Sequence, residues 1–195
     1  DKMLRLLMLD VIERIEIALR VQIALQIGQY GAWAHLDPNL LHGNFSRRPD
    51  PKTGQIKHRE WMRRVGEAFD QSKEDFAKHF RTKYAGDNPP IWIAAEAWDF
   101  GAMSILFGGL NKKDQLAIAQ KFNVPTFQSM ETWIRAINVT RNICAHHSRL
   151  WNRPIVIQPT WPIAAAVPLL GHLVGNTHAQ TRIYGIACIC GYLLR

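Results

Sequence analysis

The sequence predicts an all-α protein, and three observations support this. Apolar residues recur at helical spacing over stretches longer than ordinary strands, prolines and glycines gather between those stretches, and only Ile155 to Ile157 has the composition of a strand. The length of 195 residues and the hydrophobic content of 47% suit one domain. We therefore expect a single domain over 1–195. Because the helical patterns at both ends lack capping and turn signals, we expect the domain to be truncated at both ends.

The elements follow in order along the chain. Residues 3 to 30 contain no proline and predict a long, mostly buried helix that ends at Gly28 and Gly31. Prolines, glycines and basic residues mark 37–58 as a long basic loop or insertion. Helical segments are expected at about 59–84, at 90–107, and after Asn111. A further helix begins at Thr126 or Ser129 and ends by Pro154. Prolines make 154–177 an irregular connection, and a last helix is expected from about 178.

Cysteine usage and hydropathy bear on location. The three cysteines, Cys144, Cys188 and Cys190, have no CxxC or Cys/His ligand spacing, which argues against a disulfide framework or a structural zinc site. A reducing cytoplasm is the expected compartment. The apolar run from Tyr184 to Leu194 is too short to cross a bilayer, so no membrane association is expected.

The charge is unevenly distributed. The chain has 24 Lys+Arg against 16 Asp+Glu, and from Thr132 to Arg195 it has six arginines and no acidic residue. Clustered cations bind polyanions well, because each neutralised phosphate releases counterions. We therefore expect a nucleic acid partner. The alternative is a basic surface that only keeps the protein soluble.

On a helical wheel, residues 133 to 153 separate into an apolar back and a polar front. The back places His147 among apolar neighbours, which predicts a buried structural role. The front places His146 among arginines, which predicts a proton carrier beside anion-binding groups. The front holds Asn138, Arg141, Asn142, Ala145, His146, Arg149, Asn152 and Arg153.

The run from Arg141 to His146 fits the RxxxxH motif, and the wider string from Asn138 to Arg153 resembles the signature of Abi-like (abortive infection) proteins in the HEPN superfamily. Three further segments support the resemblance in the same order along the chain. They are Arg14-Ile15-Glu16 with Arg20; the set Phe76, His79, Phe80, Lys83 and Tyr84; and Pro90 to Gly101 with Trp92, Glu96 and Phe100.

The resemblance implies a HEPN-like helical bundle that dimerises and cleaves RNA without metal or other cofactor. It also implies phage defence by abortive infection or a toxin–antitoxin system, with single-stranded or structured small RNA as partner. His146 would act as general base or acid, Arg141 would stabilise charge on the phosphate, and Asn142 would orient His146 or the phosphate. Further RNA contacts are expected from Asn138, Arg149 and Arg153, and from Arg47, Arg48, Arg63 and Arg64 of the basic loop and its continuation.

One helix separates Arg141 and His146 by about 7.5 Å along its axis and about 140° around it. We therefore expect a symmetric homodimer through the Arg141 to Arg153 face or its border, so that a second copy supplies the missing groups.

This mechanism has two alternatives. A two-metal nuclease needs converging carboxylates, which the C-terminal third lacks. The acidic residues Asp10, Glu13 and Glu16 are better explained by pairing within the first helix. A non-catalytic RNA-binding or partner-binding module remains open.

Overall fold

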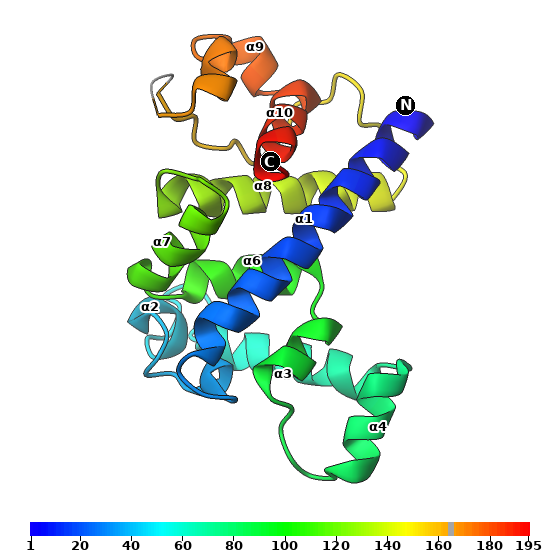
Figure 1. Ribbon diagram of the computed structural model, residues 1–195, viewed down its shortest axis with the longest axis vertical. Coiled ribbons are helices and arrows are strands. Elements are labelled where there is room, and N and C mark those ends of the chain that lie inside the picture. Colours follow the sequence, from blue (N-terminus) through cyan, green and yellow to red (C-terminus); the bar gives the residue numbers. More distant parts are fainter. Residues whose placement is uncertain (164–165) are drawn as a thin grey trace. The chain divides into compact units, whose positions relative to one another are not determined.

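The structure, a computed structural model, describes residues 1–163 and 166–195. The regular elements of these residues are all helices, with no strand among them, which confirms the all-α prediction. The α-helices are α1 (Lys2–Gly28), α2 (Gly43–Ser46), α3 (Lys57–Gln71), α4 (Asp75–Lys83), α5 (Ile91–Ala94), α6 (Phe100–Gly109), α7 (Lys112–Lys121), α8 (Phe127–Ala145), α9 (Thr177–Gln180) and α10 (Ile183–Leu193). The described part of the chain also contains the 3₁₀ helices η1 (Ala34–Leu36), η2 (Ala95–Ala97) and η3 (Pro168–Leu173). Figure 1 shows their course.

The chain forms two compact units. Unit 1 contains residues 1–19 and 118–195, and unit 2 contains residues 20–117. Helices α1 and α7 each contribute residues to both units. None of the helices in the described part of the chain is both long and apolar enough to span a bilayer.

Unit 1 is organised around α8 and α10, which pack against each other (Figure 1). The fully buried Trp133 of α8 donates its indole N–H to the Thr160 carbonyl at 2.9 Å and meets the Tyr192 ring of α10 edge-on. Gly185 allows α10 to approach α9 closely, because a Cβ there would lie 2.8 Å from the Ala179 carbonyl oxygen. The apolar core of unit 1 therefore covers the apolar face of α8 and does not cover its polar face.

Unit 2 is organised around α3, which contacts α2, α4, α6 and η2. Trp61 of α3 donates to the Ala102 carbonyl at 2.9 Å and meets Trp98 edge-on at 5.2 Å. The buried His58 of α3 donates from Nε2 to the His35 carbonyl of η1 at 2.8 Å. Aromatic packing therefore fixes the centre of this unit.

Several predicted elements differ in detail. The helix expected over 90–107 is interrupted, because the Asp99 carboxylate accepts a 2.6 Å hydrogen bond from the Ala102 N–H and begins a new helix. The 37–58 loop contains the short helix α2, and the last long helix begins at Ile183 rather than near 178. Ile155 to Ile157 is not a strand. Within the expected irregular connection 154–177, the structure has η3, and residues 164–165 lie outside the described residues.

Two buried histidines make unit 2 sensitive to acid. Burial, with a smaller contribution from the charge of His58, lowers the pKa of His35 to about 4, and burial also lowers the pKa of His58. His35 is 2% exposed and lies against Trp98. As the pH falls below about 6.5, the two histidines become protonated in the unfolded chain but stay neutral in the folded state. The stability that these two neutral histidines contribute is therefore fully present at neutral pH and is lost as the pH falls toward 4.

We expect the free energy of unfolding to fall by about 2 kcal/mol between pH 7.5 and pH 5 through His35 alone. Urea titrations at both pH values measure this change. His35→Leu, which cannot titrate, should show a flatter pH dependence. An equally steep fall in that variant would mean that His35 is not the group responsible.

Candidate functional site

Helix α8 has the predicted beginning and the predicted apolar back. The Thr126 hydroxyl accepts a hydrogen bond from the Ser129 N–H at 3.1 Å and caps the helix. Asn138 and Arg141 are partly exposed and Asn142 is exposed, as the polar front requires. The buried residues that the wheel placed on the back are Trp133, Ala136, Ile137, Thr140, Ile143 and Cys144.

The helix ends well before the proline that was expected to stop it. Ala145 is its last residue and His146 its C-cap. His147 has a positive φ of 56°, its N–H donates to the Cys144 carbonyl at 3.1 Å, and the Ser148 N–H donates to the Ile143 carbonyl at 3.0 Å. These are the two bonds of a Schellman motif, here with histidine at the position that usually holds glycine.

This ending corrects two predictions from the wheel. His147 is exposed and is not a core residue, because the chain leaves the helix before it could reach the apolar back. Arg149 and Arg153 do not project from α8 but belong to the segment that follows it. His146 stays exposed at the end of the helix, where its N–H donates to the Asn142 carbonyl at 3.0 Å.

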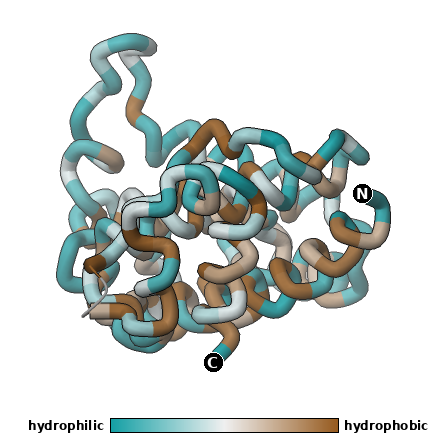
Figure 2. The backbone as a smooth tube through the Cα atoms, turned by 90° about the horizontal axis from the view of Figure 1, so that it is seen from above, coloured by the Kyte–Doolittle hydropathy of each residue, from teal (hydrophilic) through white to brown (hydrophobic). Residues whose placement is uncertain are grey.

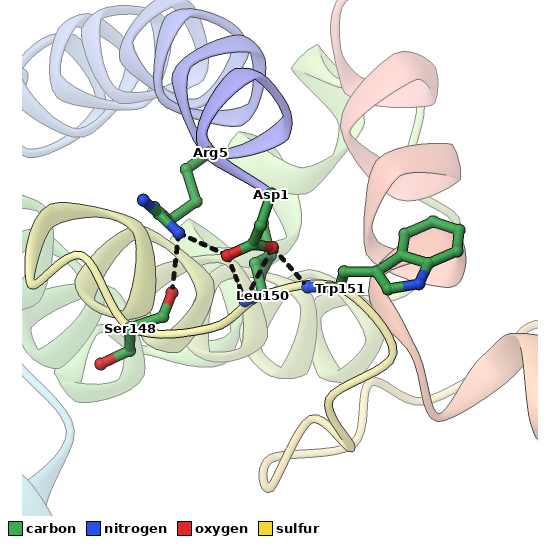
Figure 3. A network of polar contacts seen from close by, with 5 residues as sticks. All are labelled: Asp1, Arg5, Ser148, Leu150 and Trp151. Carbon is green, nitrogen blue, oxygen red and sulfur yellow. Dashed lines mark hydrogen bonds and ion pairs between the residues drawn. The ribbon is translucent and has the colours of Figure 1, made fainter.

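A carboxylate from the start of α1 fixes that segment (Figure 3). The Asp1 side chain accepts hydrogen bonds from the N–H groups of Leu150, at 3.1 Å, and Trp151, at 2.8 Å. Arg5 forms an ion pair with Asp1, and its Nη1 donates to the Ser148 carbonyl at 3.5 Å. The fully buried Leu150 side chain anchors the same segment. The backbone beside His146 is therefore held in place within unit 1.

The same segment displays an aromatic side chain. The indole of Trp151 is 67% exposed and points away from the Asp1 carboxylate (Figure 3), although its backbone N–H is bound there. Next to it, Asn152 accepts a hydrogen bond from Arg182 at 3.2 Å, which brings a further cation to the segment. The sequence patterns did not indicate Asp1, Arg5, Trp151 or Arg182, since these contacts join positions 30 to 150 residues apart.

Among the residues that the structure describes, the cations at and after the end of α8 have no acidic partner. Arg141, Arg149 and Arg153 form no ion pair in the described part of the chain, and the Arg141 Nη1 contacts only the neighbouring Asn142 Oδ1, at 3.5 Å. No carboxylate of residues 1–163 and 166–195 therefore neutralises these charges, and an anion at this surface meets guanidinium groups, an amide and an imidazole.

The basic residues predicted to bind RNA in unit 2 have different surroundings. Arg63 of α3 pairs with Glu60 at 2.5 Å and with Glu67 at 2.7 Å, which raises the pKa of the guanidinium. Arg64 pairs with Asp99 at 2.5 Å. Arg47 and Arg48 donate to the side-chain oxygens of Asn39 and Asn44. The charges of Arg63 and Arg64 are thus partly offset by carboxylates, whereas Arg47 and Arg48 form no ion pair among the described residues.

Metal coordination has no evident support among the described side chains. No group of three or more His, Cys, Asp or Glu side chains is placed to hold a metal ion in 1–163 and 166–195.

Comparison with known proteins gives one finding. The family model described as Abi-like protein matches residues 1–152, a range that includes α1, the Arg141 to His146 motif and the segment fixed by Asp1. No curated protein and no solved structure matches the chain.

Proposed function

Because this chain belongs to the Abi-like protein family, we propose that it is a metal-independent endoribonuclease that cleaves RNA at the end of α8. The family points to abortive infection, a defence against phage, and the enzyme would serve such a system or a toxin–antitoxin pair in the cytoplasm. Its RNA would be single-stranded or a structured small RNA, and it would act as a homodimer. The observation that carries this proposal is the exposed His146 at the C-cap of α8, five residues after Arg141, a cation without an acidic partner in the described part of the chain.

The proposed reaction is attack by the RNA's own hydroxyl. His146 takes the proton from the ribose 2′-hydroxyl, and the 2′-oxygen forms a bond to the adjacent phosphorus. The bond from phosphorus to the 5′-oxygen breaks, and that oxygen leaves with a proton from the imidazolium. Arg141 stabilises the negative charge that develops on the phosphate oxygens, and Asn142 orients Arg141. The products are a 2′,3′-cyclic phosphate and a 5′-hydroxyl.

The surroundings of His146 supply further RNA contacts in this proposal. Arg149 and Arg153 follow on the fixed segment and bind neighbouring phosphates. The exposed indole of Trp151 offers a face on which a base can stack, an interaction that single-stranded nucleic acids commonly make. Asn138, one turn before Asn142 on α8, would extend the contact along the helix.

The test is digestion of single-stranded RNA in excess chelator, with analysis of the product ends. We expect cleavage to persist in chelator, to yield 2′,3′-cyclic phosphates, and to stop at any nucleotide that carries 2′-deoxyribose, because that sugar lacks the nucleophile. Activity that disappears with chelator would indicate metal catalysis instead. Tight binding of intact RNA without cleavage would identify the protein as an RNA-binding module.

A further inference from the structure

Helix α1 is apolar on two opposite sides, and only one of them is buried. The buried side consists of Met8, Ile12, Ile15, Leu19, Ile23 and Ile27. On the other side, Met3, Leu7, Ile17 and Val21 are between 46% and 66% exposed. Figure 2 shows hydrophobic residues recurring along the helix that starts at the end marked N. The sequence predicted a mostly buried helix, so this exposed side is where prediction and structure disagree.

The exposed side has the spacing of a coiled-coil seam. Positions 3, 7, 10, 14, 17 and 21 are separated by alternating steps of four and three residues, which keeps them on one stripe of the helix. Asp10 and Arg14 occupy the middle of this stripe and pair with each other at 3.1 Å, with side chains 60% and 66% exposed. A helix face that stays in solvent is normally polar, so four large apolar side chains at seam positions indicate a face that binds a partner.

We propose that this stripe, which we call the α1 seam, binds the α1 seam of a second copy in antiparallel orientation. A twofold axis at the level of Ile12 places residue n opposite residue 24 − n of the partner. Met3 then faces Val21 of the second copy, and Leu7 faces Ile17. Asp10 faces Arg14 in both directions. Every apolar position meets an apolar one and every charge meets its opposite, as a self-complementary interface requires.

The charges select the antiparallel arrangement. In a parallel pair, Asp10 would face Asp10 of the second copy and Arg14 would face Arg14, and such like-charge contacts are unfavourable. Only the antiparallel register removes both repulsions while it keeps the apolar pairs. The inference names the interface of the homodimer in the proposed function, but it uses no residue of the α8 site and no property of RNA, so RNA cleavage by a monomer would overturn the α1 seam alone.

The α1 seam differs from the contact expected from the sequence. The Arg141 to Arg153 surface is polar and charged, whereas the centres of stable interfaces are apolar. In the antiparallel pair, the two Arg5 residues lie roughly 21 Å apart along the helix axis, since each is seven residues from the twofold axis. Because Arg5 contacts Ser148 next to the motif, the two motifs lie at opposite ends of this interface.

Charge reversal tests the proposal, with molar mass in solution as the measurement. The wild-type chain should be a dimer. Asp10→Arg should weaken dimerisation by on the order of tenfold or more, since two pairs of arginines then face each other. Arg14→Asp should do the same with two pairs of aspartates. An equimolar mixture of the two variants should form a heterodimer, and the double variant Asp10→Arg/Arg14→Asp should dimerise like the wild type.

Heterodimer formation by the two single variants points to the α1 seam, because Asp10 and Arg14 both lie on it and opposite charges are then restored only across the antiparallel contact. Both residues are exposed, so circular dichroism should show folded variants. Ile105→Glu, at an exposed apolar position of α6, is the matched control and should leave the mass unchanged. The proposal would be overturned if the wild type were a monomer. It would also be overturned if the wild type were a dimer and its molar mass stayed the same in Asp10→Arg, Arg14→Asp and Leu7→Glu. In the first case a different partner would have to cover the seam.

Discussion

Replacing His146 with alanine should slow RNA cleavage by about 10²–10⁴-fold, because the substitution removes the proton carrier from the 2′-hydroxyl attack. His146 is exposed at the end of α8, so the fold should be unaffected. The rate of cleavage in excess chelator is the measurement. RNA affinity, measured separately, should change much less than the rate, since one imidazole is lost from a surface that keeps its arginines.

The neighbouring His147 provides a matched control. It is also exposed, but it has a positive φ, so asparagine is a better replacement than alanine because it tolerates that backbone conformation. His147→Asn should cleave RNA at nearly the wild-type rate. If His146→Ala remained active and His147→Asn did not, the catalytic role would belong to His147 and the RxxxxH interpretation would be wrong.

How far the sequence predicts this site depends on the range of the interactions. The apolar back of α8 follows from periodicity alone, and within the helix the wheel correctly places the buried residues Trp133, Ala136, Ile137, Thr140, Ile143 and Cys144. The end of the helix does not follow from periodicity. It depends on a histidine at positive φ and on a carboxylate 149 residues earlier that binds the Leu150 and Trp151 amides. The positions of Arg149, Arg153 and Trp151 therefore could not be predicted from the sequence and are known only from the structure.

The same distinction applies to the basic residues and to α1. The pairs of Arg63 with Glu60 and Glu67 have the spacing of intrahelical ion pairs and could have been predicted locally. The pair of Arg64 with Asp99 could not, because it joins residues 35 positions apart. For α1, composition correctly indicated an apolar helix. However, burial also depends on which surfaces are available, and within the described part of the chain only one side of α1 is covered.

The two proposals together predict how mixed variants behave. If the α1 seam joins the two copies, each motif works within its own protomer, and mixing the slowed variants Arg141→Ala and His146→Ala should not raise the rate of cleavage. Restored cleavage would mean that Arg141 of one copy and His146 of another act on the same phosphate. That result would support the dimer expected at the α8 face.

Arg141→Ala should slow cleavage by about 10²–10³-fold through the loss of charge stabilisation at the phosphate. Arg141→Lys should recover part of the rate, since lysine keeps the charge but lacks the planar fork that can bind two phosphate oxygens. Arg135, on the same helix, is the matched control, because it is exposed and already pairs with Glu131 at 2.8 Å. Arg135→Ala should therefore cleave RNA almost as fast as the wild type. Equal losses in the two variants would show that the helix contributes only general positive charge, and Arg141 would then have no specific role at the phosphate.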